Sequence, residues 1–235
     1  MCMYKQRFFC SVALAIVFCW SVAAGSVSAQ QVLVDDAEIT PPRSAQIEVW
    51  HGWQESWILP AVQLIPRLEL SAGTAFVREE ESDLRSTEYG FEGKVSILDP
   101  ETAPAGLAAV VGTGVTRLGL PKQSPETVYA FVPASQELID DRLTVYQNVG
   151  WAREDGGPSV LTWGARIDVT PIDRFTLIGE VFGEGEEPPA FQTALRTEVI
   201  PERLEVDLSL TRSEFAGDTD YWVTAGITLV SPSIY

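Results

Sequence analysis

Cysteine, histidine and long apolar runs are scarce in this 235-residue chain. Its three cysteines, Cys2, Cys10 and Cys19, all lie near the amino terminus, and His51 is the single histidine. After residue 30 no stretch approaches the roughly 18 apolar residues that a membrane-spanning helix needs. These absences exclude disulfides, Cys/His metal clusters and a transmembrane helix from the rest of the chain.

Basic residues are also scarce. Of the 16 basic residues, Lys5 and Arg7 stand at the amino terminus, and the other 14 face 33 acidic residues, a net charge of −19. Without a basic patch, nucleic acid is not an expected partner. The sequence also has no phosphate-binding loop and no spaced set of calcium ligands, so neither a cofactor nor a metal site is expected.

The first 29 residues read as a secretory signal peptide. Lys5 and Arg7 precede an apolar run from Phe8 to Trp20, and small residues follow up to Ala29. We expect cleavage after Ala29 and export from the cytoplasm. A retained membrane anchor is the alternative, for which the run is short. A lipoprotein site at Cys19 is disfavoured because a bulky residue precedes it.

Two further segments follow the predicted signal peptide. Residues 30–44 contain several acidic residues and two prolines, and they are predicted to be an irregular periplasmic lead-in. Residues 45–235 are predicted to form one domain, in which apolar and polar residues alternate with the period of a β-strand. In the clearest segment Leu161, Trp163 and Ile167 alternate with Arg166 and Asp168.

Such alternating segments number about twelve. An even number of strands, each about ten residues long and tilted near 45°, covers about 23 Å, close to the apolar band of an outer membrane at about 25 Å. The sequence therefore predicts an all-β, up-and-down antiparallel transmembrane β-barrel. The expected strands are 46–54, 57–65, 67–77, 87–97, 105–116, 126–133, 142–152, 159–169, 174–184, 190–199, 203–212 and 220–230.

A turn followed by an arginine recurs between these segments, at Arg67, Arg142, Arg174 and Arg203. We expect these arginines at the periplasmic rim. There they either contact lipid phosphates or are simply exposed to water at the turn. Four other connections are longer and acidic, as in outer-membrane barrels with short turns on one rim and longer loops on the other. The acidic connections are residues 79–83, 154–157, 184–189 and 214–218.

Charged residues at mid-strand positions indicate which face lines the interior. An arginine facing lipid at the membrane midplane costs about 2–4 kcal/mol, a large share of a domain's stability of about 5–15 kcal/mol. We therefore expect these side chains to line the lumen, with opposite charges able to pair across neighbouring strands. The expected lumen charges are Glu48, Glu69, Glu92, Lys94, Arg166, Asp168, Glu180, Arg196, Glu198, Glu205 and Asp207.

Aromatic residues are expected in girdles at the two membrane interfaces. The expected members are Trp53, Trp57, Tyr89, Trp151, Trp163, Phe175, Phe191 and Tyr221. A soluble β-sandwich is the alternative explanation of the alternation. The strand count and the two classes of connection argue against it.

An enzyme is not expected. His51 lies in Trp50-His51-Gly52-Trp53, and no nucleophile motif such as Gly-x-Ser-x-Gly accompanies it. The favoured interpretation is that His51 lies at the membrane interface beside the tryptophans.

The proline–arginine turns, the Trp50–Trp53 strand and the stretch from Arg196 to Leu229 resemble small proteobacterial outer-membrane β-barrels. In particular they resemble the transporter group of the phenol-degradation meta-pathway. The resemblance covers most of residues 45–230 and implies an outer-membrane barrel that passes small organic solutes, but it carries over no functional residue. Such barrels commonly end in an aromatic residue. Tyr235 fits, although Pro232 and the following serine interrupt the approach.

Together these features predict a narrow passive channel or transporter for small solutes, with a preference for cations. Its expected partners are outer-membrane lipid, lipopolysaccharide and the barrel-assembly machinery. Two alternatives stay open: a non-conducting structural or surface-interaction barrel that acts through its acidic loops and, less favoured, a lipid-modifying barrel enzyme.

Overall fold

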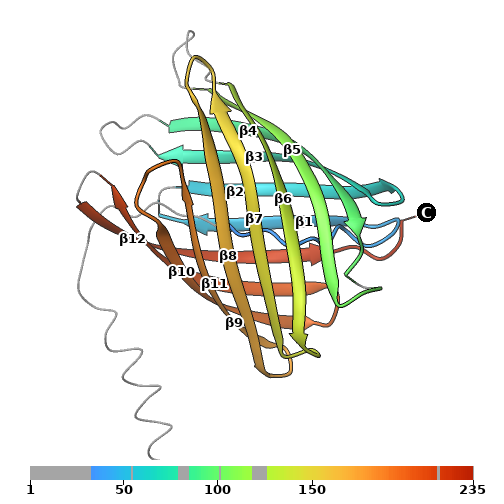
Figure 1. Cartoon of the computed structure of the whole chain (residues 1–235). Helices are drawn as coiled ribbons and strands as arrows, with labels where there is room; N and C mark the ends of the chain where they lie inside the picture. Colours follow the sequence, from blue (N-terminus) through green and yellow to red (C-terminus); the bar gives the residue numbers. More distant parts are fainter. Residues whose placement is uncertain are drawn as a thin grey trace, which may run out of the picture.

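The computed structural model describes residues 33–53, 55–78, 85–100, 102–117, 126–215 and 218–234. The predicted signal peptide, Tyr235 and the acidic connection 79–83 lie outside them. Twelve antiparallel strands close into a barrel, each pairing with its neighbours in sequence (Figure 1). They are β1 (Ala45–Gly52), β2 (Glu55–Ile65), β3 (Leu68–Arg78), β4 (Arg85–Leu98), β5 (Ala105–Arg117), β6 (Glu126–Ile139), β7 (Leu143–Glu154), β8 (Ser159–Ile172), β9 (Phe175–Glu184), β10 (Ala190–Ile200), β11 (Leu204–Phe215) and β12 (Asp218–Val230).

The prediction of an up-and-down barrel is confirmed, and each of the twelve predicted segments corresponds to one strand. The barrel closes where β1 pairs with β12, from Gln46 opposite Val230 to Gly52 opposite Thr224. Closure pairs every strand on both sides, so no sheet edge is left open.

Strand β6 shows the largest departure from the predicted boundaries, since it continues to Ile139 rather than ending at Pro133. Proline lacks the N–H that a ladder needs, so Pro133 weakens the pairing of this strand. The β5–β6 register is indeed interrupted between Leu107 and Val110. The ladder to β7 runs on through Pro133, opposite Asn148, and holds the strand together.

The outer wall is apolar and the inner wall is polar, which rules out the sandwich alternative. Leu161 and Leu208 are 58% and 45% exposed on the outside, whereas Arg166 and Asp207 are 6% and 3% exposed inside. No helix in the described part of the chain is long and apolar enough to cross a membrane. A continuous apolar outer surface on a closed sheet is what a lipid environment requires.

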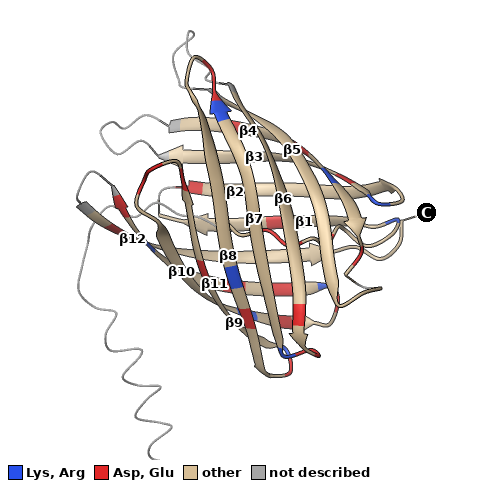
Figure 2. Cartoon of the chain, viewed as in Figure 1, with Lys and Arg blue, Asp and Glu red and all other residues tan. Residues whose placement is uncertain are grey.

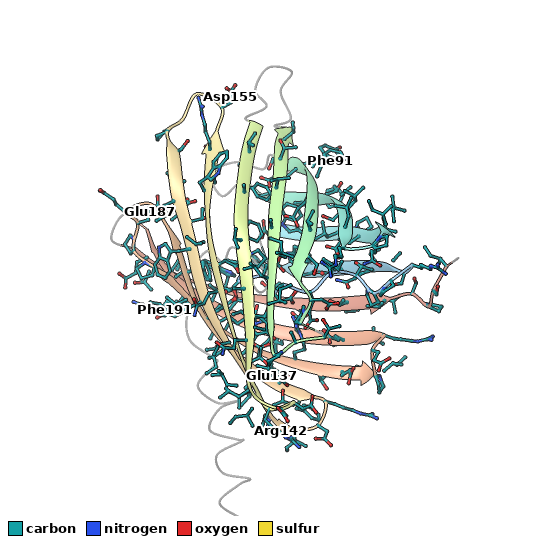
Figure 3. All side chains as sticks on the ribbon, turned by 45° about the vertical axis from the view of Figure 1, so that its right-hand side comes forward. Phe91, Glu137, Arg142, Asp155, Glu187 and Phe191 are labelled. Carbon is teal, nitrogen blue, oxygen red and sulfur yellow. The ribbon has the colours of Figure 1, made fainter. Side chains whose placement is uncertain are left out.

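Most of the residues expected in the aromatic girdles are exposed on the outer wall, and Phe191 is labelled there in Figure 3. Trp57 departs from the expectation. It lies opposite Trp50 in the β1–β2 register and stacks on it, with ring centroids 5.8 Å apart. Trp50 is buried on the inner face, so Trp57 belongs to the interior.

The two rims differ in their connections, as predicted. Figure 3 shows Glu137 and Arg142 at one end of the barrel and Asp155 and Glu187 toward the other. We call these ends the turn rim and the loop rim. The turn rim joins β2–β3, β4–β5, β6–β7, β8–β9 and β10–β11, and both the start of β1 and the end of β12 lie there.

The arginine turns share a backbone arrangement. In each one the arginine carbonyl accepts a hydrogen bond from the backbone N–H of the strand beyond the hairpin, at 2.8–3.0 Å. The left-handed residue differs, however. It is the arginine itself at Arg67 (φ 66°) and Arg174 (φ 72°), but the preceding residue in the other two turns, Asp141 and Glu202.

Candidate functional site

Residues 33–40 of the lead-in lie inside the barrel (dark blue in Figure 1). Val34 and Ala37 are 1% and 0% exposed, although neither belongs to a strand. The segment was predicted to be an irregular periplasmic lead-in; its described residues form no helix or strand, and Val34 and Ala37 lie in the lumen. The polar lumen supplies partners for an irregular backbone, which water would otherwise have to provide.

Carboxylates and a hydroxyl of the wall bind the backbone of the lead-in. The two carboxylate oxygens of Glu180 accept the N–H groups of Leu33 and Val34, both at 3.0 Å. Glu69 accepts the N–H and the hydroxyl of Thr40 at 2.5 and 2.6 Å. Across the lumen, the Ser135 hydroxyl accepts the N–H of Ala37 at 2.9 Å. These bonds fix the segment at both ends and in the middle.

An ion-pair cluster holds the acidic residues of the lead-in. Lys94 Nζ lies 2.9 Å from Asp35 Oδ2 and 3.4 Å from Asp36 Oδ1, and its side chain is buried. Burial raises the pKa of Asp36, but the nearby Lys94, Arg166 and Arg196 outweigh burial and hold the pKa below its usual value. Asp36 therefore stays ionised against Lys94.

Asn148 adds a further anchor on β7. In the orientation that satisfies its hydrogen bonds, its side-chain oxygen accepts the N–H of Asp35 at 2.8 Å and its nitrogen donates to the Asp35 carbonyl at 2.9 Å. The wall thereby pairs with both backbone groups of this residue.

Arg166 is the most connected cation of the lumen. Its guanidinium donates to both oxygens of Asp168 on the same strand and to the carbonyl of Val34 at 3.3 Å. It also lies 4.4 Å above the centre of the Tyr146 ring. Arg166 is opposite Glu180 in the β8–β9 register but does not pair with it, because Glu180 is occupied by the lead-in.

Arg196 and Asp207 also differ from the simplest cross-strand pairing. They are opposite each other in the β10–β11 register. Arg196 Nε instead comes within 3.5 Å of Glu205, and Asp207 Oδ1 is buried with no hydrogen-bond partner among the described residues. Asp207 lies against the wall, where a Cβ on Gly226 would fall 2.6 Å from its carboxylate oxygen.

The remaining expected lumen charges divide between the interior and the rim. Glu92 accepts the hydroxyl of Tyr129 at 2.9 Å, and Glu48 accepts the side-chain amide of Gln46 at 2.6 Å. Glu198 accepts the N–H of Glu202 at 2.6 Å, which places it beside the β10–β11 turn.

All four predicted turn arginines are exposed at the turn rim. Arg142 pairs with Asp173 of the neighbouring turn at 3.0 Å and donates to the carbonyl of Thr170 at 3.1 Å. Arg203 also lines an interior cavity that reaches this rim.

Two cavities of similar volume lie beside the lead-in. The turn-side cavity, of about 420 Å³, reaches from Glu202 and Arg203 to the middle of the lumen. The loop-side cavity, of about 430 Å³, reaches inward from Glu187 at the loop rim. Val34 and Phe131 line both cavities, so the lead-in lies at their junction.

The outer wall carries a Ser–His contact that sequence reasoning missed. His51 Nδ1 lies 2.6 Å from the Ser56 hydroxyl, since the β1–β2 hairpin sets them opposite each other. No carboxylate or amide is seen to complete a triad with His51 in the part of the chain that the structure describes. A hydrogen-bonded pair alone does not make a nucleophile.

The fold is similar to that of solved outer-membrane channels. One is the COG4313 outer membrane channel from Pseudomonas putida F1, with a TM-score of 0.65 and 10% identity over 86% of this chain and 100% of that chain. Another is the KdgM porin in complex with disordered oligogalacturonate, with a TM-score of 0.59 and 10% identity over 78% of this chain and 98% of that chain. At this identity the likeness shows a shared fold.

A search of curated proteins finds no match to this chain. The model of one protein family, however, matches residues 15–231, nearly the whole chain. The protein therefore belongs to the family described as "Uncharacterised conserved protein UCP029691".

Proposed function

We propose that the protein is an outer-membrane channel that admits small solutes by passive diffusion through a lumen narrowed by its own lead-in. The observation that carries this proposal is the pair of cavities that approach from the two rims and meet at Val34 and Phe131. Twelve strands enclose more space than an eight-stranded barrel, whose side chains fill it, and less than an open sixteen-stranded porin. The space left by the lead-in suits small molecules.

The charge of the lumen favours cations. Eight acidic and four basic residues line the turn-side cavity. A cavity with an excess of one charge concentrates ions of the opposite charge. This supports cation preference, as the acidic sequence suggests.

We also propose which rim of the barrel faces outward and which kind of solute the channel admits. Acidic residues lie at the loop rim (red in Figure 2), which suits an outer surface. Asp155 and Glu187, labelled in Figure 3, are both exposed there. The turn rim would then face the periplasm, with its arginines near lipid phosphates. The resemblance to the meta-pathway transporters points to small organic solutes. Delivery would require the signal peptide, cleavage after Ala29 and the barrel-assembly machinery.

Planar-bilayer recordings of the purified protein test the proposal. We expect a small conductance whose reversal potential in a salt gradient shows cation selectivity. Deleting residues 33–44 should raise the conductance, because this segment separates the two cavities. Heat-modifiable gel migration verifies that both forms are folded. If neither form conducts above background, the channel proposal is wrong, and a non-conducting barrel that acts through its loops takes its place.

A further inference from the structure

The loop-side cavity has a wall unlike that of the turn-side cavity. The aromatic rings of Phe131, Phe182 and Trp222 line it, and the lead-in residues Leu33 and Val34 also contribute. Cavities of this size with aromatic walls and a few polar groups are typical of small-molecule sites.

Carboxylates line the same cavity toward the loop rim. Glu184 and Glu187 of the β9–β10 connection both line it, and neither forms an ion pair within the described part of the chain. Glu214 also lines it but is paired with Arg212. Two uncompensated carboxylates above aromatic faces attract an organic cation by charge and by cation–π contact.

Trp222 supplies an independent observation. It is 6% exposed on the inner wall, and its buried indole N–H has no hydrogen-bond partner among the residues that the structure describes. A buried donor without a partner is costly and rare in native proteins. A ligand that carries an acceptor atom would satisfy it.

We propose that the loop-side cavity binds small organic cations that combine an apolar body, an ammonium group and a hydrogen-bond acceptor such as a hydroxyl. The ammonium group faces Glu184 and Glu187, the body packs against Phe131 and Phe182, and the acceptor meets the indole N–H of Trp222. This inference rests on the proposed channel, whose solute class it specifies.

Isothermal titration of the full protein in detergent micelles tests this site with three probes. They are 2-amino-1-phenylethanol, phenethylamine, which lacks the hydroxyl, and mandelate, which replaces the aminomethyl group by a carboxylate. We expect the amino alcohol to bind at least about tenfold more tightly than mandelate. The double variant Glu184→Gln/Glu187→Gln should weaken its binding by about five- to tenfold, as expected for loss of two exposed charge contacts.

Matched variants separate the contacts. Asp155→Asn removes an acidic residue of the neighbouring β7–β8 connection that does not line the cavity, and it should leave binding unchanged. Trp222→Phe should abolish the preference for the amino alcohol over phenethylamine. Should that variant not fold, Phe182→Leu removes an aromatic face and should weaken both amines.

Equal binding of the amino alcohol and mandelate, or no loss in the double variant, would overturn the inference. Because the titration does not depend on transport, its result stands apart from the conductance. A barrel that conducts but does not prefer the amines contradicts only this inference. A barrel that binds the amines but never conducts contradicts only the channel.

Discussion

At the scale of single residues, the carboxylates of the lumen serve mainly as acceptors for backbone. Glu180 and Glu69 together accept three N–H groups and a hydroxyl from the lead-in. A buried carboxylate without hydrogen bonds or a counter-charge is costly, and so is an unpaired N–H. Each group satisfies the other, so the lead-in and the wall depend on each other inside the lumen.

Two glycines leave the space that the lead-in occupies. A Cβ on Gly164 would fall 2.6 Å from Val34 Cγ2, and one on Gly106 would fall 2.8 Å from the Cβ of Ala37. We expect Gly164→Ala to shift the lead-in and raise single-channel conductance, because such overpacking costs about 1–3 kcal/mol. Gly90→Ala is the control, since nothing lies within 4 Å of that position. Equal conductance of the Gly164 and Gly90 variants would contradict the prediction.

Lys94 is the cation that retains Asp35 and Asp36 in the lumen. Breaking a buried ion pair by removing one partner costs about 3–5 kcal/mol. The lead-in can avoid this cost by carrying its aspartates into water, so we expect Lys94→Met to release the segment without unfolding the barrel. Limited proteolysis with a glutamate-specific protease would reveal cleavage after Glu38. Lys94→Arg keeps the charge and should stay protected, and protection of both variants would argue against an electrostatic anchor.

At the scale of elements, the hairpin turns set how neighbouring strands meet. Arginine carbonyls in four of them accept N–H groups from the next strand. Two of these turns place the arginine itself in the left-handed region, which costs a residue with a side chain about 1–2 kcal/mol. The recurring sequence motif thus covers two backbone forms.

This difference predicts that substitution of these arginines by glycine changes the stability of the barrel in some turns only. Arg67→Gly and Arg174→Gly should each stabilise the barrel by up to about 1 kcal/mol, because glycine adopts positive φ without strain. Arg203→Gly should give no gain, since Glu202 carries the positive φ in that turn. Samples are heated to increasing temperatures before electrophoresis, and the temperature at which the folded band disappears measures the stability of each variant. A similar rise for Arg203→Gly would show that turn strain is not the cause.

At the scale of the whole molecule, the closed sheet separates an apolar exterior from a charged interior. The outward residues of neighbouring strands form one surface because registers such as Leu195 opposite Leu208 align them. Both side chains are exposed on the outer wall. This surface requires lipid, or detergent in its place, to be stable.

The depth of a position on this surface sets the cost of a charge. Leu208→Arg should destabilise the barrel in lipid vesicles by about 2–4 kcal/mol, as expected near the midplane. Val199→Arg, next to the end of β10 and 50% exposed, should cost about 0–1 kcal/mol. Urea unfolding followed by tryptophan fluorescence compares the two. Equal costs would mean that the outer wall does not cross a membrane.

The sequence predicts those features of the fold that depend on one strand alone, and it misses those that depend on how strands pair. Alternation along Leu161 to Asp168 requires one strand only, and it assigns each side chain to a face before any partner is known. The sequence did not predict that β6 continues beyond Pro133, because the effect of a missing N–H depends on which neighbouring strand it faces. The contact between His51 and Ser56 depends on the hairpin register, which no motif records.

The sequence by itself determined the twelve strands, their two faces and the two classes of connection, since each follows from residues adjacent in the chain. Only the tertiary structure decided that the lead-in lies in the lumen. Residues 33–44 have no strand periodicity, and their backbone partners stand 29 to 147 positions away, at Glu69, Ser135 and Glu180. An irregular segment carries no local signal for burial, because its hydrogen bonds can be satisfied equally by water or by a wall that only the closed barrel assembles.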